Sequence, residues 1–448
     1  MNDHRKKRLE DSGVDALAEA LLKLANQNEA AQVMVERLIN TPQETLKQVK
    51  IKLSRFKRSR EFISWRESAK FARELEDLQQ DIKAGVDDPR TGVELVASFF
   101  ETDRGTLAYC DDSSGHVGDV YRFAAKDLFV EYAARCDDKE WLGELVFTLN
   151  RKDDYGVRDT LIHCAAEYLP ESQIRNMIAR LKTLAEAETE EYQRRHWLLG
   201  IESLARQIKD APLFEETRIA AWGTPSTSAC ADIARVYLES GHAETALSWL
   251  ERVPAQETFQ IDQRDHLLLQ IYDRLGNREK QADVAWRIFR RFRCSDSLHA
   301  LLAVIGQDKR ESVITDEIQA IVSQKTLVLS DAAFLLEIEC LDEGERYLLD
   351  RADQLDGNHY GTLLPLAEIL ETEGRALAAT IVYRALLDSI LRRAQSKTYH
   401  HGVRYLKKLD KVAQSISDWR NFDDHGIYSE HLQGKHRRKT SFWSRYRS

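Results

Sequence analysis

Two consecutive copies of one helix-turn-helix pattern, spanning Ser228–Arg293, constrain the fold of this 448-residue chain more than any other feature. In each copy apolar residues recur every three or four positions, a glycine follows, and a second apolar run begins. Tyr237 and Tyr272 are 35 residues apart, and so are Gly241 and Gly276. A shared period of this length is typical of stacked two-helix repeats. The pattern therefore predicts an array of helix pairs.

The repeat pattern returns between Leu363 and Leu391, where Gly374 stands in the place of the earlier glycines. Gly374 follows Gly276 by 98 residues, which is close to three units of about 33 residues each. Two degenerate units therefore fit between the clear copies, and we expect the array to be continuous.

Composition agrees with a helical array. Only 20 glycines and 7 prolines occur in 448 residues, and scarcity of both turn-forming residues favours long helices over hairpins. We predict an all-α protein, an α-α superhelix in which a helical-repeat half precedes the better-preserved array. Its expected parts are an N-terminal helical region with Asp-rich loops (1–190), the repeats (191–417) and a basic, aromatic C-terminal tail (418–448).

Two segments have the residue spacing of a capping box, in which Thr and the Glu three positions later satisfy each other's backbone N–H. They are Thr41-Pro42-Gln43-Glu44 and Thr91-Gly92-Val93-Glu94. We expect a helix to begin at each of them.

The sequence carries no sign of secretion or of a membrane span. Its basic start, residues 4–8, is not followed by an apolar segment, and no run of about 18 apolar residues occurs anywhere. The six cysteines lie far apart without a Cys-x-x-Cys pair, as expected for reduced, mostly buried thiols. The net charge of −9 means that any basic partner surface must be local. We expect a cytoplasmic protein that does not bind membranes.

Two acidic loops are candidate metal sites. Asp111, Asp112 and Asp119 surround one loop, and Asp153 and Asp154 occupy the corresponding place one helix pair later. Several carboxylates in one place could bind a hard cation such as Mg²⁺ or Ca²⁺. The alternative is helix capping, which favours Asp and Ser at the same positions and needs no ion.

A basic stripe on the helix expected after Pro42 is a candidate phosphate-binding surface. We expect Arg55 and Arg58 to contact the phosphates. In the alternative interpretation, the stripe is a helix face that is exposed to solvent and binds nothing. Cations at this density can bind nucleic-acid phosphates in a salt-dependent way, without regard to base sequence. The seven cations of the basic stripe are Lys47, Lys50, Lys52, Arg55, Lys57, Arg58 and Arg60.

The C-terminal tail mixes cations with aromatic residues. Arg437, Arg438 and Lys439 precede Phe442 and Trp443, a composition that suits a stacking platform for single-stranded nucleic acid. In the alternative interpretation, the aromatic residues fasten the tail to the last repeat and leave the cations outside.

No motif for catalysis or for a cofactor occurs. The chain has no nucleophile elbow, phosphate-binding glycine loop or His-Glu-x-x-His sequence. The late histidines lack the spacing of a zinc site. We therefore predict no catalytic residues and no cofactor, and the sequence lends no support to an enzyme.

The chain shows two resemblances to known families. Ser228–Arg293 and residues 363–391 resemble tetratricopeptide repeats. Nearly the whole chain is similar to a bacterial family of helical-repeat proteins, through Asp111-Asp112-Ser113-Ser114-Gly115, Asp154-Tyr155-Gly156-Val157-Arg158-Asp159 and the basic ending. Related segments occur in proteins with a SWIM zinc finger, whose zinc ligands are absent here. The resemblance implies a helical solenoid from a bacterial cytoplasm and no particular activity.

Three functions follow as hypotheses. The first is a scaffold that binds a protein or peptide in the concave groove of the solenoid, with Tyr237 and Tyr272 as contact residues. The second is nucleic-acid binding through the basic stripe or the tail. The third is a metal-dependent hydrolase at the Asp loops.

Overall fold

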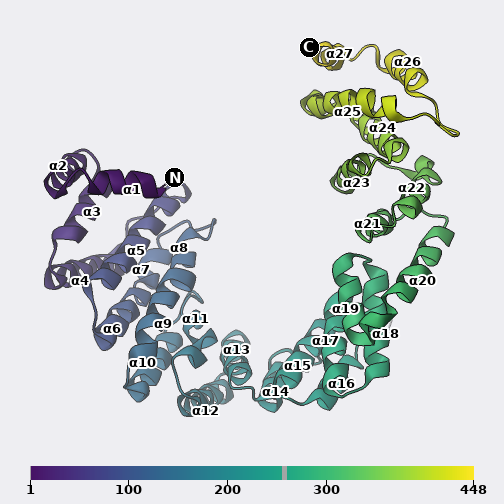
Figure 1. The fold of residues 1–448 in the computed structure, drawn as a ribbon. Coiled ribbons are helices and arrows are strands. Elements are labelled where there is room, and N and C mark those ends of the chain that lie inside the picture. Colours follow the sequence, from purple (N-terminus) through teal and green to yellow (C-terminus); the bar gives the residue numbers. More distant parts are fainter. Residues whose placement is uncertain (1, 255–259) are drawn as a thin grey trace. The chain divides into compact units, whose positions relative to one another are not determined.

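The computed structural model describes residues 2–254 and 260–448 (Figure 1). Within these ranges the regular elements are all helices, and the sole strand-like feature is an isolated parallel bridge between Ile63 and Cys110. The predicted all-α class is confirmed. The chain forms two compact units, Met1–Gln256 and Glu257–Ser448.

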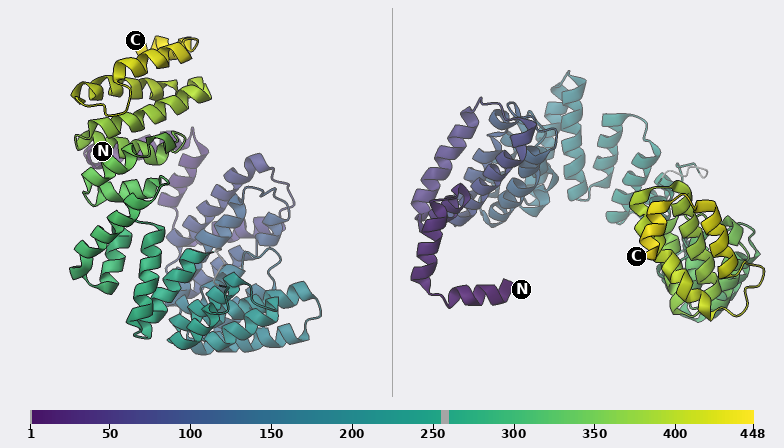
Figure 2. Two further views of the ribbon diagram at one scale, coloured as in Figure 1. Left: turned by 90° about the vertical axis from the view of Figure 1, so that its right-hand side faces the viewer. Right: turned by 90° about the horizontal axis from the view of Figure 1, so that it is seen from above.

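Helices that follow one another in the N-terminal unit mostly pack against each other (Figure 1 and Figure 2). A continuous core runs from α4 to α14. The elements are α1 (Asn2–Glu10), α2 (Val14–Ala25), α3 (Glu29–Ile39), α4 (Pro42–Arg58), α5 (Trp65–Gly85), α6 (Pro89–Phe100), α7 (Asp103–Leu107), α8 (His116–Asp119), the π-helix η1 (Val120–Ala125), α9 (Lys126–Arg135), α10 (Lys139–Arg151), α11 (Asp159–His163), the 3₁₀ turn η2 (Ala165–Glu167), α12 (Glu171–Ala187), α13 (Glu191–Gln207), α14 (Ala211–Trp222), α15 (Thr227–Glu239) and α16 (Ala243–Leu250).

Local capping chemistry sets where these helices begin. Thr41 and Glu44 form the predicted capping box at α4, in which the backbone N–H of each residue donates to the other's side chain. The capping box predicted at Thr91 is wrong. Helix α6 begins three residues earlier, because Asp88 accepts the Thr91 N–H at 2.8 Å and Pro89 supplies a favourable first turn.

Close packing between α6 and α9 depends on Gly92. A Cβ at this position would collide with the ring of Tyr132. The Tyr132 hydroxyl in turn donates to the carbonyl of Val86 at 2.8 Å, so the same tyrosine ties the end of α5 to this helix pair.

The C-terminal unit has its own core, which runs from α18 to α27. Its elements are α17 (Ile261–Arg274), α18 (Arg278–Arg291), α19 (Ser295–Ile305), η3 (Gln307–Lys309), α20 (Arg310–Ser323), α21 (Leu329–Glu337), α22 (Leu341–Leu349), η4 (Ala352–Gln354), α23 (Tyr360–Thr372), α24 (Ala376–Arg393), η5 (Ser396–Thr398), α25 (Tyr399–Val412), η6 (Ala413–Ser415), α26 (His425–His436) and α27 (Thr440–Arg447).

A recurring turn between paired helices reveals the repeat. At each turn one residue has a positive φ, and the successive spacings are 32, 35, 30, 33 and 35 residues. Gly306 and Glu339 mark the two units expected between Gly276 and Gly374, so that prediction is confirmed. The turn residues are Lys209, Gly241, Gly276, Gly306, Glu339 and Gly374.

Backbone hydrogen bonds explain why five of these turns need a left-handed residue; the turn at Gly306 differs, with φ 109° and ψ 137°. In the turn at Gly374, the N–H of Arg375 donates back to the Leu370 carbonyl at 2.8 Å. The same bond joins Asn277 to Tyr272 at 3.0 Å. This closure of a helix end requires the intervening residue in the left-handed region, which glycine enters without steric cost.

The predicted start of the repeat array and the division between the two compact units lie at different places in the chain. The array was expected to begin at residue 191, which is the first residue of α13. The division into compact units falls at Gln256, inside that array. Because a repeat boundary and a division between compact units are different properties, the boundaries at 190 and 417 stay predictions.

The predicted tail is folded. Helix α27 packs against α25, with Phe442 edge-to-face on Tyr399 at 5.7 Å between ring centroids. The indole N–H of Trp443 donates to the His436 carbonyl at 3.0 Å, and the Tyr446 hydroxyl donates to Asp410 at 2.7 Å. The aromatic residues therefore fasten the end of the chain to the last helices.

Candidate functional site

Helix α5 has a surface groove on each of two opposite faces. The first, which we call the α4–α5 groove, has a volume of about 750 Å³. It lies between the C-terminal half of α4, the connector that follows it and the N-terminal half of α5. Its lining residues are Ile51, Arg55, Phe56, Arg58, Ser59, Glu61, Phe62, Ile63, Glu67, Lys70, Phe71 and Glu74.

Two anchors hold the α4–α5 groove in shape. The rings of Phe56 and Phe71 pack edge-to-face at 5.6 Å and join the two helices beneath it. The connector is pinned at Ile63, whose N–H donates to the Tyr109 carbonyl at 2.8 Å and whose carbonyl accepts the Asp111 N–H at 2.9 Å. The groove is therefore preformed.

Large apolar side chains in the α4–α5 groove remain in contact with solvent. Ile51 is 60% exposed and Phe62 is 66% exposed. Of the described residues that line the groove, three are cations and three are carboxylates, as the composition of the lining shows. Exposed apolar surface rimmed by polar groups is typical of a protein-interaction site.

The structure places both cations chosen from the basic stripe, Arg55 and Arg58, in this groove. The Arg55 guanidinium lies 4.9 Å from the centroid of the Phe56 ring, and Arg58 is held by Ser54 of its own helix. Two other members of the stripe are paired elsewhere: Lys52 contacts Asp81 at 2.9 Å and Lys57 contacts Glu101 at 2.5 Å. The stripe is thus less positive than its sequence indicates.

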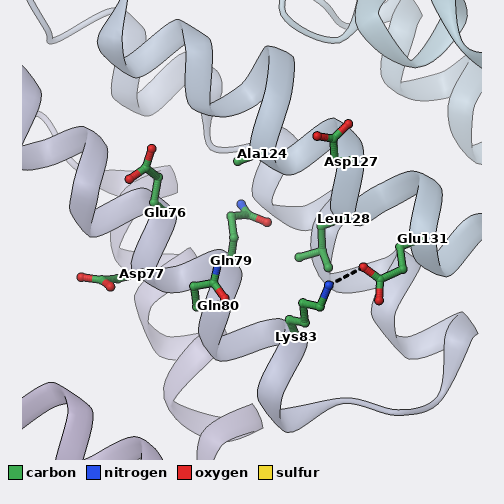
Figure 3. Close-up of a pocket in the computed structure, with 9 residues that line it drawn as sticks. All are labelled: Glu76, Asp77, Gln79, Gln80, Lys83, Ala124, Asp127, Leu128 and Glu131. Carbon is green, nitrogen blue, oxygen red and sulfur yellow. Dashed lines mark hydrogen bonds and ion pairs between the residues drawn. The ribbon is translucent and has the colours of Figure 1, made fainter. Parts of the chain in front are cut away.

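The second groove, which we call the α5–α9 groove, lies on the other face of α5, toward α8, η1 and α9 (Figure 3). It consists of two adjoining cavities of about 410 and 370 Å³, which share Glu76 and Ala124. Its lining residues are Ala69, Ala72, Arg73, Glu76, Asp77, Gln79, Gln80, Lys83, His116, Asp119, Val120, Phe123, Ala124, Asp127, Leu128 and Glu131.

Gln79 is the unusual residue of the α5–α9 groove. Its side chain extends from α5 toward Ala124 (Figure 3), and the residue is only 3% exposed. Neither amide atom has a hydrogen-bond partner in the part of the chain that the structure describes. A buried polar group without a partner costs roughly 1–3 kcal/mol, and packing alone would favour an apolar residue here.

Gln79 was not among the residues selected from the sequence, although a signal was present. Ala72, Leu75 and Ile82 form the apolar stripe of α5, and Gln79 continues that stripe at helical spacing. A polar residue inside an apolar stripe is an expected marker of a buried hydrogen bond or of a binding site. The depth of its burial depends on η1 and α9, which are about 45 residues away along the chain.

Carboxylates outnumber cations around the α5–α9 groove. Lys83 and Glu131 form an ion pair of 2.6 Å that bridges the groove (Figure 3). Among the described lining residues, Arg73 is the remaining arginine or lysine, whereas Glu76, Asp77, Asp119 and Asp127 add further carboxylates. Two of these have a cation beside them, since Asp127 pairs with Lys126 at 2.6 Å and Asp119 lies 3.7 Å from Arg122. The groove is therefore suited to a positively charged ligand.

The first Asp-rich loop performs helix capping. Asp112 accepts the N–H groups of Val117 and Gly118 at 2.9 and 2.8 Å, at the start of α8. Asp111 accepts the Ser113 N–H, and Asp119 lies 3.7 Å from Arg122. Burial beside the acidic loop raises the pKa of the Cys110 thiol to about 11, so this cysteine is a poor nucleophile at neutral pH.

The second Asp-rich loop is organised in the same way. Asp153 accepts the N–H groups of Tyr155, Arg158 and Asp159, and Asp154 lies 3.5 Å from Arg104. In residues 2–254 and 260–448, no group of three or more His, Cys, Asp or Glu side chains is placed to hold a metal ion. The geometry of both loops supports capping, and the metal site stays a prediction without a ligand set.

The two repeat tyrosines lie inside the packing of their units. Tyr237 is 8% exposed and donates to Glu215 at 2.6 Å, and Tyr272 is 9% exposed. Such side chains have little surface to offer a partner. Their role in binding stays a prediction, and the contacts that the structure shows are internal.

The tail residues divide into an exposed and a buried set. Arg437 and Arg438 are exposed, Lys439 is half-buried and Trp443 is buried. Because Trp443 is buried and its indole N–H donates to the His436 carbonyl, its ring has little surface on which a base could stack. The binding roles of the tail residues stay predictions.

This chain belongs to the family described as "Family of unknown function (DUF6880)", whose model matches residues 3–445. No curated protein matches the chain. A solved structure described as "Circular tandem repeat protein with novel repeat topology and enhanced subunit contact surfaces" is 16% identical, over 97% of this chain and 98% of that chain, with a TM-score of 0.17. So low a TM-score carries no conclusion about function. The relations to tetratricopeptide repeats and to SWIM proteins stay resemblances.

Membrane-spanning segments were not found in the described ranges. None of the helices there combines the length and the apolar character that crossing a bilayer requires.

Proposed function

We propose that this protein is a helical-repeat scaffold whose N-terminal unit binds a short segment of a partner protein in the α4–α5 groove. One observation carries the proposal: Ile51 and Phe62, two large apolar side chains of a preformed groove, are 60% and 66% exposed. Leaving apolar surface in water is unfavourable, at about 25 cal/mol per Å². A partner that covers these side chains recovers that free energy.

The charges around the groove favour a protein over a nucleic acid. Arg55, Arg58 and Lys70 are matched by Glu61, Glu67 and Glu74 among the described lining residues. A surface for phosphates needs an excess of positive charge. Equal numbers of both signs instead suit a segment with one apolar anchor and flanking side chains of both charges. The cytoplasmic location stays part of the proposal.

A displayed library of random peptides, selected against the full-length protein, tests this function. We expect enrichment of peptides with a Leu, Phe or Trp anchor between charged residues. The affinity of a selected peptide should fall at least tenfold in Phe62→Ser, because the anchor loses its apolar contact. Tyr192→Ser is the matched control, since Tyr192 is 83% exposed and lies outside the groove.

Two results would contradict the proposal. One is a selection without apolar anchors. The other is binding of single-stranded DNA that weakens steeply with salt and is abolished in Arg55→Ala/Arg58→Ala, which would favour the nucleic-acid hypothesis instead.

A further inference from the structure

We propose that the α5–α9 groove is a second binding site, which takes an extended polypeptide segment carrying lysine or arginine, and that the Gln79 amide pairs with a peptide group of that segment. The proposal concerns a different face of α5 from the α4–α5 groove and does not depend on it. It rests on the unpartnered amide, on the charge of the rim and on the length of the groove.

The unpartnered amide indicates the chemistry of the ligand. Gln79 offers one carbonyl acceptor and an NH₂ donor in one plane, and both atoms are buried without a partner among the residues that the structure describes. A backbone peptide group offers the complementary donor and acceptor, so one segment can satisfy both atoms at once. Ala124 lies close to the Gln79 side chain (Figure 3), and both residues line the same cavity of about 410 Å³.

The rim selects the charge of the segment. Glu76, Asp127 and Glu131 lie along the same groove as Gln79 (Figure 3). Two of these carboxylates are paired, Glu131 with Lys83 and Asp127 with Lys126, both at 2.6 Å, whereas the described residues form no ion pair with Glu76. The remaining excess of carboxylates disfavours phosphate groups on this face. A polyamine would suit the charge but has no acceptor for the Gln79 NH₂ group. A cationic peptide satisfies both requirements.

The groove has the dimensions of a short peptide. Its α5 side runs from Ala69 to Lys83, a length of about 21 Å at the rise of an α-helix. An extended chain covers that length with about six residues. The far wall includes the π-helix η1 (Val120–Ala125), and π-helical turns occur frequently at functional sites.

Fluorescence anisotropy with the full-length protein tests the proposal. The probe is a fluorescein-labelled peptide of eight residues that alternates lysine and alanine, and the reference probe alternates glutamate and alanine. We expect only the lysine probe to bind, and more weakly as salt increases. Gln79→Leu should weaken its binding at least tenfold while the melting temperature stays equal or rises, because the buried amide is removed.

Control variants separate the amide from the charge. Glu76→Gln should weaken the lysine probe severalfold without changing the melting temperature. Gln48→Leu, at an exposed position on α4, should leave binding unchanged. Phe62→Ser, which tests the α4–α5 groove, should also leave it unchanged, so failure of one site is distinguishable from failure of the other.

Three results would overturn the proposal. The first is equal affinity of the wild type and Gln79→Leu for the lysine probe. The second is a lowered melting temperature of Gln79→Leu, which would give the amide a structural role. The third is spermine that competes with the lysine probe equally well in both proteins, which would show recognition of charge alone.

Discussion

The guanidinium of Arg158 donates two hydrogen bonds to the carboxylate of Asp103, one of 2.8 Å from Nε to Oδ2 and one of 2.7 Å from Nη2 to Oδ1. Both side chains are buried, with exposures of 5% and 1%. The pair joins α7 to the turn that precedes α11, 55 residues later in the chain. This bidentate contact links two segments of the N-terminal unit that are far apart in the sequence.

Arg158→Met should destabilise the N-terminal unit by about 3–5 kcal/mol, because it leaves a carboxylate buried without its partner. Hydrogen exchange of the amides in α7 measures the loss as faster exchange. Arg104→Met is the matched control: Arg104 is adjacent to Asp103, but its side chain is 81% exposed, so exchange should change little.

Replacing both partners distinguishes a lost ion pair from lost packing. In Asp103→Leu/Arg158→Met no charge remains buried, so α7 should exchange more slowly than in Arg158→Met alone. Equal exchange in the single and double variants would mean that shape, and not charge, governs this contact.

Asp265 should make the C-terminal unit sensitive to acid. Burial acts to raise the pKa of its carboxyl, but hydrogen bonds from Arg287 and Arg291 outweigh it, and the pKa is lowered. The pKa of Asp265 in the folded protein therefore lies below the value of about 3.9 for an unfolded chain. Its ionised carboxylate stabilises the fold at pH values above about 3.9, and this stabilisation is lost as the pH falls through the folded-state pKa.

A pH series of thermal unfolding checks this expectation. The melting temperature at which the C-terminal unit unfolds should fall as the pH decreases from 5 to 3. Hydrogen exchange of the amides in α17 and α18 shows whether it is this unit that loses stability. Asp265→Asn should be less stable at pH 7 and show a shallower fall over the same range. An unchanged slope in Asp265→Asn would assign the acid sensitivity to other carboxylates.

Gly374→Ala should lower the stability of the C-terminal unit by about 1–2 kcal/mol, because φ is +72° there and an L residue is strained in that region. No atom lies within 4 Å of the Cβ that the substitution adds, so the effect isolates backbone strain. Urea denaturation followed by circular dichroism measures it.

Gly434→Ala is the matched control for this substitution. Gly434 lies inside α26, its added Cβ also meets nothing within 4 Å, and its φ is not positive. The same change should here raise stability by about 0.5–1 kcal/mol, since alanine favours a helix interior. Destabilisation by both substitutions would refute the strain argument.

The repeat could be predicted where its turns keep glycine. Gly241, Gly276 and Gly374 stand out in the sequence, and the structure shows the same left-handed conformation at all three. Lys209 and Glu339 adopt that conformation too, at a cost that neighbouring helices must offset. Because glutamate does not signal such a turn, the unit that turns at Glu339 was expected from spacing alone.

In the candidate site, too, some features could be predicted from the sequence and others could not. Arg55 and Arg58 were chosen for their charge, and the structure places them in a groove whose apolar members, Ile51 and Phe62, were not selected from the sequence. Trp443 was chosen for its ring, which the structure buries. Charge and residue type are local properties, whereas exposure depends on which helix lies opposite.

The sequence by itself determined the helical class, the helix-pair period and the capping box at Thr41, because apolar spacing, turn glycines and capping side chains act over a few residues. Only the tertiary structure decided that Arg158 grips Asp103, that Trp443 is buried and that Gln79 has no partner among the described residues. These outcomes depend on contacts between segments far apart in the chain. Burial and hydrogen-bond pairing are set by packing, which a local pattern does not contain.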